Sequence, residues 1–271
     1  MVALAVAAIG LFFSRGWHRF KNAPRRPIVF LPEIAIVLAM TMYLLGPIGA
    51  AIAARFYGVS PPPPTAEYAL DDQAKLVLGT YLGQSIVLVV LIGLTMKAGR
   101  ASTDSRPGWI KASLIGAGTL LLALPLILAS AAVASVVASL VRGQAVDPIA
   151  HETLRMFIRE PVDGWYIAFG AMVILIAPIM EEVLYRGLVQ RTLVQVGLPR
   201  WWAIILTSLA FALMHMRIVD IYVLPALFVL SLGFGWAYEK TGRISASITM
   251  HILFNAANLA VALLTSSPTA T

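Results

Sequence analysis

The chain of 271 residues is 59% hydrophobic and only 12% charged, and its net charge at neutral pH is +7. Soluble domains carry about a quarter charged residues, so this composition excludes an ordinary soluble protein and indicates a polytopic membrane protein. The sequence contains no cysteine, which excludes disulfides, a thiol nucleophile and thiolate metal ligands. The basic residues lie in loops between apolar segments, as the positive-inside rule describes, so we expect no nucleic-acid partner.

Eight apolar segments predict an all-α, polytopic transmembrane bundle of about eight helices. In chain order the segments are 1–13, 28–57, 75–96, 109–141, 164–196, 200–218, 219–238 and 244–264. The first segment is short for a bilayer about 30 Å thick. Its positive charges follow it rather than precede it, opposite to a signal peptide, so we expect a membrane-spanning helix.

The distribution of Lys and Arg predicts the orientation in the membrane. If the segments alternate, four connections on one side (14–27, 97–111, 181–200 and 239–243) carry 14 of the 20 basic residues, and the other side carries six. The side richer in basic residues is normally cytoplasmic. The sequence therefore predicts a multi-pass protein of the plasma (cytoplasmic) membrane with both termini outside.

The character of the segments changes near residue 160. Residues 1–160 form apolar helices without a recognisable motif, in which Gly116 and Gly118 are expected to provide a close-packing surface. Leu154, Phe157 and Ile158 recur at helical spacing and predict a short amphipathic helix in the following connection. Residues 161–271 are predicted to be a catalytic helical core, because polar residues enter the apolar segments there.

Three polar motifs occur in this second region. They read Glu181-Glu182-x-x-x-Arg186, Phe211-x-x-x-His215 and His251-x-x-x-Asn255. An ionisable side chain at membrane depth costs roughly 2.5–3.5 kcal/mol or more, so such residues usually serve a function. A carboxylate pair, two imidazoles and an amide are also the groups that can activate water and stabilise an oxyanion.

Each motif alone has a simpler interpretation. Glu182 and Arg186 are four residues apart and can form a helical ion pair that only anchors the helix end, which would leave Glu181 on another face. His215 could be an interfacial histidine, and His251 with Asn255 could only form hydrogen bonds between helices. The joint occurrence of the three motifs favours a functional site.

In this order on successive membrane helices, the three motifs resemble the CPBP family. This family comprises CAAX-protease and bacteriocin-processing intramembrane endopeptidases, including Rce1-like and Abi-type members. The resemblance covers roughly residues 164–264 and shows no departure at the motif positions. It implies an intramembrane endopeptidase that hydrolyses a peptide bond of a membrane-tethered protein or peptide.

The resemblance also implies roles for individual residues. Glu181, with His215, would activate the attacking water, and His251 with Asn255 would stabilise the tetrahedral oxyanion. Glu182 and Arg186 would support these residues rather than touch the substrate.

The sequence leaves the need for a metal open. No cofactor is favoured, but Glu181, His215 and His251 could supply one Glu and two His ligands for zinc. Against zinc, the His-Glu-x-x-His pattern is absent, and neither histidine has a second ligand one turn away.

Two other functions would be compatible with the same residues. A non-catalytic immunity or scaffold protein could bind a partner through the same polar pocket. A proton-coupled transporter could use Glu and His as a relay, although the inverted repeat common in transporters is not apparent.

Overall fold

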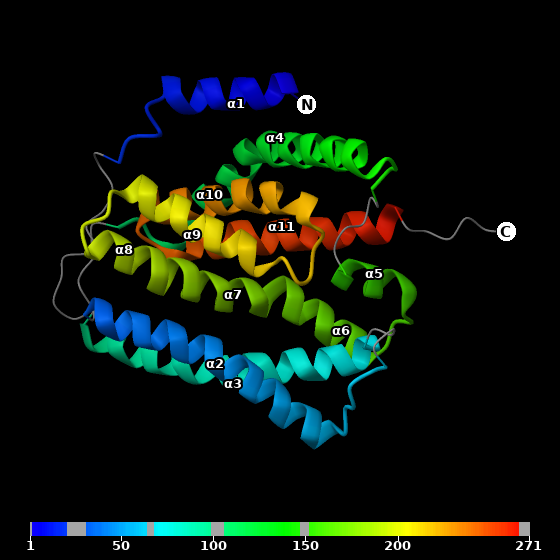
Figure 1. Ribbon diagram of the computed structural model, residues 1–271. Coiled ribbons are helices and arrows are strands. Elements are labelled where there is room, and N and C mark those ends of the chain that lie inside the picture. Colours follow the sequence, from blue (N-terminus) through cyan, green and yellow to red (C-terminus); the bar gives the residue numbers. More distant parts are fainter. Residues whose placement is uncertain (1, 21–30, 64–67, 99–105, 147–151, 266–271) are drawn as a thin grey trace. The chain divides into compact units, whose positions relative to one another are not determined.

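The computed structural model describes residues 2–20, 31–63, 68–98, 106–146 and 152–265, and all regular elements among them are helices (Figure 1). Six helical stretches are long and apolar enough to cross a membrane: Pro32–Tyr57, Leu70–Leu94, Trp109–Arg142, Gly164–Gln195, Ile221–Thr241 and Ile244–Thr265. Two apolar helices are shorter than these six: Val2–Ser14 and Arg200–Met214. The predicted all-α, polytopic bundle is therefore confirmed. Much of the basic connections 14–27 and 97–111 lies outside the described residues.

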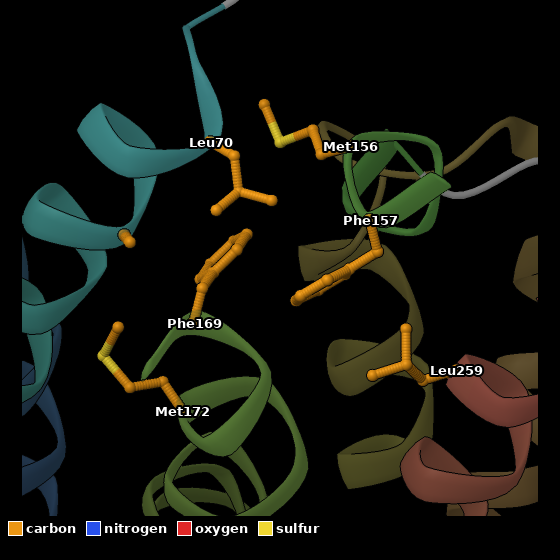
Figure 2. Close-up of a cluster of buried hydrophobic side chains, with 7 residues drawn as sticks. Leu70, Met156, Phe157, Phe169, Met172 and Leu259 are labelled. Atoms are coloured by element: carbon orange, nitrogen blue, oxygen red, sulfur yellow. The ribbon is translucent and has the colours of Figure 1, made fainter. Parts of the chain in front are cut away.

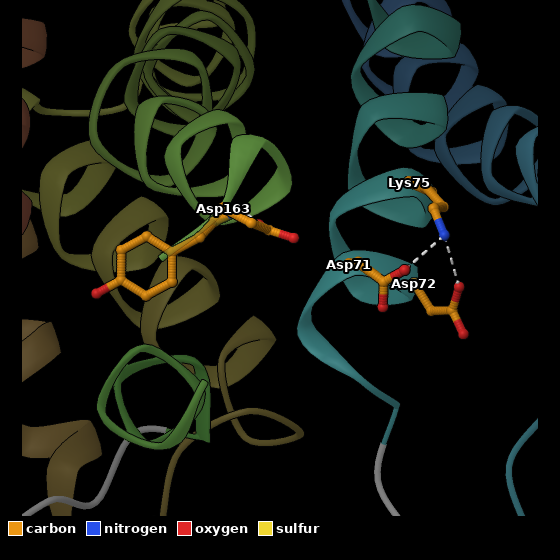
Figure 3. A network of polar contacts seen from close by, with 5 residues as sticks. Asp71, Asp72, Lys75 and Asp163 are labelled. Carbon is orange, nitrogen blue, oxygen red and sulfur yellow. Dashed lines mark hydrogen bonds and ion pairs between the residues drawn. The ribbon is translucent and has the colours of Figure 1, made fainter. Parts of the chain in front are cut away.

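The helix bounds differ from the predicted segments by up to five residues, and two of these differences are at the start of α3 (Leu70–Ala98) and the end of α9 (Arg200–Met214). Helix α3 begins five residues before the predicted start at residue 75. Its first turn contains Asp71 and Asp72, and Lys75 pairs with both at 2.7 and 3.0 Å (Figure 3). Because these charges are paired within the helix, they do not delay its start. Helix α9 ends four residues before the predicted end at 218.

The chain divides into two compact units. Unit 1 comprises residues 1–26, 104–152 and 196–254, and unit 2 comprises residues 27–103, 153–195 and 255–271. Each unit therefore combines segments from both sides of residue 160. The division into regions 1–160 and 161–271 was based on motif content and stays a prediction.

Unit 1 contains α1 (Val2–Ser14), α4 (Trp109–Arg142), α9, the short η4 (Ile221–Val223), α10 (Leu224–Thr241) and the first half of α11 (Ile244–Thr265). A Cβ atom added to Gly116 of α4 would lie 2.0 Å from the carbonyl oxygen of Ala246, so only glycine permits this approach of α4 and α11. Gly118 has nothing within 4 Å of the corresponding position. The predicted close-packing surface is therefore right for Gly116 and wrong for Gly118.

Unit 2 contains α2 (Pro32–Tyr57), α3, α5 (Glu152–Arg159) and the helical run from Gly164 to Gln195. Gly49 and Gly79 allow α2 and α3 to touch, since a Cβ on Gly49 would lie 2.0 Å from the carbonyl oxygen of Gly79. Helix α5 confirms the short amphipathic helix predicted from Leu154, Phe157 and Ile158.

A hydrophobic cluster in unit 2 anchors α5 (Figure 2). Phe157 of α5 stacks on Phe169 with ring centroids 5.3 Å apart, and its carbonyl accepts a hydrogen bond from the Tyr166 hydroxyl at 3.0 Å. Leu70 of α3 and Leu259 of α11 belong to the same cluster. This packing holds the start of the helical run that carries the first polar motif.

Candidate active site

The first polar motif lies in the middle of an unbroken helical run with two π-helical segments. The run consists of α6 (Gly164–Ala171), η2 (Met172–Ile176), α7 (Ala177–Glu182), η3 (Val183–Gln190) and α8 (Arg191–Gln195). Asp163 caps its start by accepting a hydrogen bond from the Tyr166 amide at 2.7 Å. π-Helical turns are rare and occur often at functional sites, and here they lie on both sides of Glu181 and Glu182.

The first π segment leaves one backbone carbonyl without its usual donors. The Ala177 amide donates to Met172 instead of Val173, and the residue that would serve Val173 in a π-helical pattern is Pro178, which has no N–H. The side-chain amide of Asn255 takes this place and donates to the Val173 carbonyl at 2.9 Å. Asn255 thus fixes the helix near Glu181, a contact that its motif did not predict.

Glu182 and Arg186 form the ion pair that their spacing predicted. Arg186 Nη1 lies 2.9 Å from Glu182 Oε1, and both side chains are 0% exposed. A fully buried carboxylate requires such a partner, because burying an unpaired charge costs several kcal/mol. The pair therefore belongs to the interior of unit 2.

Glu181 has a different environment from Glu182. It is only half-buried, so part of its surface stays accessible while Glu182 is enclosed. The two adjacent glutamates thus differ: Glu182 is fully buried in its ion pair with Arg186, whereas Glu181 is half-buried, with its Oε2 atom buried.

His215 caps the C-terminus of α9, and its ring is oriented by the backbone of the same helix. Its Nδ1 lies 2.8 Å from the carbonyl oxygen of Phe211. Because a carbonyl oxygen only accepts hydrogen bonds, Nδ1 must carry the proton, which leaves the lone pair of the neutral ring on Nε2. The geometry therefore presents Nε2 as the nitrogen that can accept a proton or bind a metal.

His251 is nearly enclosed in unit 1 and is held between aromatic rings. It is 4% exposed and stacks on Phe234, with ring centroids 4.7 Å apart and an interplanar angle of 23°. The ring of Phe211 meets the His251 ring edge-on, with centroids 5.8 Å apart. The centroid of the same Phe211 ring also lies 4.6 Å from that of His215. Phe211 thus contacts both histidines of the candidate site.

The structure brings the predicted residues together in two groups, one in each unit. His215 and His251 belong to unit 1, whereas Glu181, Glu182, Arg186 and Asn255 belong to unit 2. Among the described residues of either unit, no group of three or more His, Asp or Glu side chains could hold a metal ion.

Several contacting residues were not found from the sequence. Val173 and Phe234 carry no signal in the sequence, because each meets its partner through tertiary packing. Phe211 was part of a motif, but its contact with His251 was not predicted.

A helical bundle with several membrane spans and polar residues within them defines an integral, multi-pass membrane protein with a buried polar site. Residues 163–257 match the family model described as type II CAAX prenyl endopeptidase Rce1-like. This part of the chain is therefore an Rce1-like domain, and the resemblance to the CPBP family is confirmed. No curated protein and no solved structure matches the chain.

The matched region contains all six predicted site residues, from Glu181 to Asn255. The match to this family supports an intramembrane endopeptidase of the CAAX type in general terms and thus indicates a hydrolase. The substrate that this class implies is a membrane-tethered protein.

Proposed function

We propose that the protein hydrolyses a peptide bond of a membrane-tethered protein or peptide, with Glu181 and His215 activating the attacking water. The observation that carries the proposal is the difference between the two adjacent carboxylates. Glu182 is enclosed in an ion pair with Arg186, whereas Glu181 keeps accessible surface. A general base must be able to take up a proton, and a carboxylate held in a fully buried ion pair is unsuited to this role, so we assign it to Glu181.

His215 suits the role of a second water-binding group. Its Nδ1–H is used by the Phe211 carbonyl, so Nε2 can accept a hydrogen bond from the nucleophilic water. The water oxygen attacks the scissile carbonyl carbon while Glu181 takes the proton that the water loses. The same proton then passes to the leaving amine as the C–N bond breaks, so the enzyme returns to its starting state.

The tetrahedral intermediate needs hydrogen-bond donors for its oxyanion. We assign this role to His251 and Asn255, which are four residues apart on α11. The rings of Phe234 and Phe211 fix the plane of His251. An amide nitrogen carries two N–H groups, so Asn255 can donate one to Val173 and keep the other for the oxyanion.

The proposed reaction needs no cofactor. Zinc is the alternative, held by Glu181, His215 and His251, and His215 Nε2 is a fitting ligand atom. Metal analysis of the purified protein separates the two mechanisms. One stoichiometric zinc, lost in both His215→Ala and His251→Ala, would replace the metal-independent mechanism.

The orientation and the substrate class are also proposals. The predicted topology places 14 of the 20 basic residues on one side of the membrane. This distribution favours a protein of the plasma membrane with both termini outside and the active site toward the cytoplasm. The matching family is described by its action on prenylated CAAX proteins, so a prenylated C-terminal tail is one candidate substrate.

The test of the proposed function is a comparison of protein termini in cells that express the wild type, Glu181→Gln or Glu33→Gln. Glu33 is an exposed carboxylate outside the site and serves as the matched control. New N- or C-termini should appear with the wild type and Glu33→Gln only. If Glu181→Gln keeps the full biological effect without new termini in any sample, the protein is a non-catalytic binding or immunity factor.

A further inference from the structure

Unit 1 contains an apolar cavity that the proposed peptidase chemistry does not use. Its volume is about 250 Å³, and it lies between α1, α4, the start of α9 and α10. Phe12 of α1, Ala123 of α4 and Gly233 of α10 are among its lining residues. An apolar cavity of about 150 Å³ already stays dry and takes up apolar ligands, so water is not the expected occupant of this larger one.

One end of the cavity is lined by Trp17, Trp201 and Trp236, and two of these tryptophans use their ring nitrogens in hydrogen bonds to backbone carbonyls. Trp236 Nε1 donates to the Trp17 carbonyl at 2.9 Å, and Trp201 Nε1 donates to the His18 carbonyl at 2.8 Å. Lys240 Nζ donates to the next carbonyl, that of Arg19, at 2.7 Å. The N–H groups of Trp201 and Trp236 are therefore occupied by backbone carbonyls, and these two indole rings line the cavity mainly with hydrocarbon surface.

Basic side chains surround this tryptophan end. Lys240 Nζ lies 5.7 Å from the Trp236 ring, and Arg200 immediately precedes Trp201. Arg15 and Arg19 are exposed, and in the sequence they lie two residues before and two residues after Trp17. The acid beside this group is Glu239, which lies 3.6 Å from Arg200, so the charge here is strongly positive.

A second hollow continues along the same helices. It shares Ile9 with the first cavity and is lined by α1, by α4 as far as Arg142, by η4 and by the start of α10. From Thr119 in the first hollow to Val141 in the second, α4 advances roughly 33 Å at 1.5 Å per residue. The two hollows together therefore match a long, linear, apolar ligand better than a compact one.

We propose that this groove binds one acyl chain of an anionic phospholipid, with the lipid phosphate beside Arg15, Arg19 and Lys240. The apolar lining accounts for the chain, and the cations at the tryptophan end account for the charge of the headgroup. Tryptophan and basic residues also occur together at the level of lipid headgroups, where one end of a site is apolar and the other is wet. The site is independent of the proposed catalytic residues.

The tail-binding part of the proposal can be tested by filling the cavity. The protein is purified in mild detergent from cells, incubated with phosphatidylglycerol and examined by native mass spectrometry. Ala8→Phe and Ala123→Leu place bulk in the cavity from α1 and from α4, whereas Ala7→Phe and Ala132→Leu change exposed alanines of the same helices. We expect one retained lipid in the wild type and both controls, and at least a several-fold loss in both cavity variants.

The headgroup part is tested by charge removal. Arg15→Gln with Arg19→Gln should weaken retention of phosphatidylglycerol roughly tenfold or more, and Arg55→Gln, an exposed change in unit 2, should not. Phosphatidylcholine should be retained poorly by all variants, and inorganic phosphate should not displace the lipid, because it lacks the chain.

Three results would overturn the proposal. Equal lipid retention by the cavity variants and their controls would mean adventitious lipid only. Equal retention of phosphatidylcholine would show that the site does not require an anionic headgroup. Displacement of the lipid by a farnesylated peptide, at a stoichiometry of one, would assign the groove to a substrate instead.

Discussion

The side-chain amide of Asn255 donates a hydrogen bond to the backbone carbonyl of Val173 at 2.9 Å. The Ala177 amide donates to the Met172 carbonyl instead of the Val173 carbonyl, and Pro178 has no backbone N–H that could donate to Val173. A residue assigned to the oxyanion thus also supports the helix that carries Glu181. Asn255 connects the position of the proposed base with the position of the proposed oxyanion donor.

This relationship predicts that Asn255 and Pro178 are energetically coupled. Asn255→Ala should destabilise the protein by about 1 kcal/mol, because the Val173 carbonyl loses its donor. In a Pro178→Ala background the cost should shrink, since residue 178 then supplies a backbone N–H. A double-mutant cycle on thermal unfolding in detergent measures the coupling. Asn258→Ala, at an exposed position of α11, is the control, and strict additivity would contradict the prediction.

The buried ion pair predicts a stability effect that is distinct from catalysis. Glu182→Gln and Arg186→Met should each lower the unfolding free energy by about 3–5 kcal/mol, because each leaves an uncompensated charge in a fully buried place. Glu181→Gln should leave the thermal midpoint nearly unchanged, since Glu181 is outside this pair. A Glu182→Gln protein as stable as the wild type would refute this account of the pair.

The orientation of His215 predicts different effects for two amide substitutions. His215→Asn keeps a donor near the position of Nδ1, so it should preserve the bond to Phe211 and the stability while it removes Nε2. Peptidase activity should then fall by about 10²–10⁴-fold. His215→Gln places its amide near Nε2 instead and should lose more stability than His215→Asn. Equal stability with full activity in His215→Asn would show that Nε2 has no role.

Gly116 and Gly118 predict opposite outcomes for the same change. Gly116→Ala should destabilise unit 1 by about 1–3 kcal/mol, because its Cβ would collide with the Ala246 carbonyl. Gly118→Ala meets nothing within 4 Å and should be neutral or slightly stabilising, since alanine favours helix formation. Equal thermal midpoints for the two variants would contradict the observed approach of α4 and α11.

The sequence predicted what repeats along a helix and missed what depends on tertiary contact. The spacing of Glu182 and Arg186 was sufficient to predict their ion pair, because both lie on one helix face. Gly116 and Gly118 are alike in the sequence, and only the position of Ala246 separates them. The contact from Asn255 to Val173 spans 82 residues and depends on an unusual helical turn, so no local pattern reveals it. The apolar segment predicted from residue 75 leaves out the first turn of α3, in which Asp71 and Asp72 are polar and pair with Lys75.

The most direct test of the central claim is the rate at which Glu181 variants hydrolyse a membrane-tethered peptide in vesicles. The peptide is taken from the cleaved terminus found in cells, and the wild type is compared with Glu181→Gln and Glu33→Gln at equal protein and confirmed insertion. We predict that Glu181→Gln is slower by about 10² or more and that Glu33→Gln matches the wild type. A Glu181→Gln enzyme that cuts the peptide at the wild-type rate would contradict the assignment of Glu181 as the base.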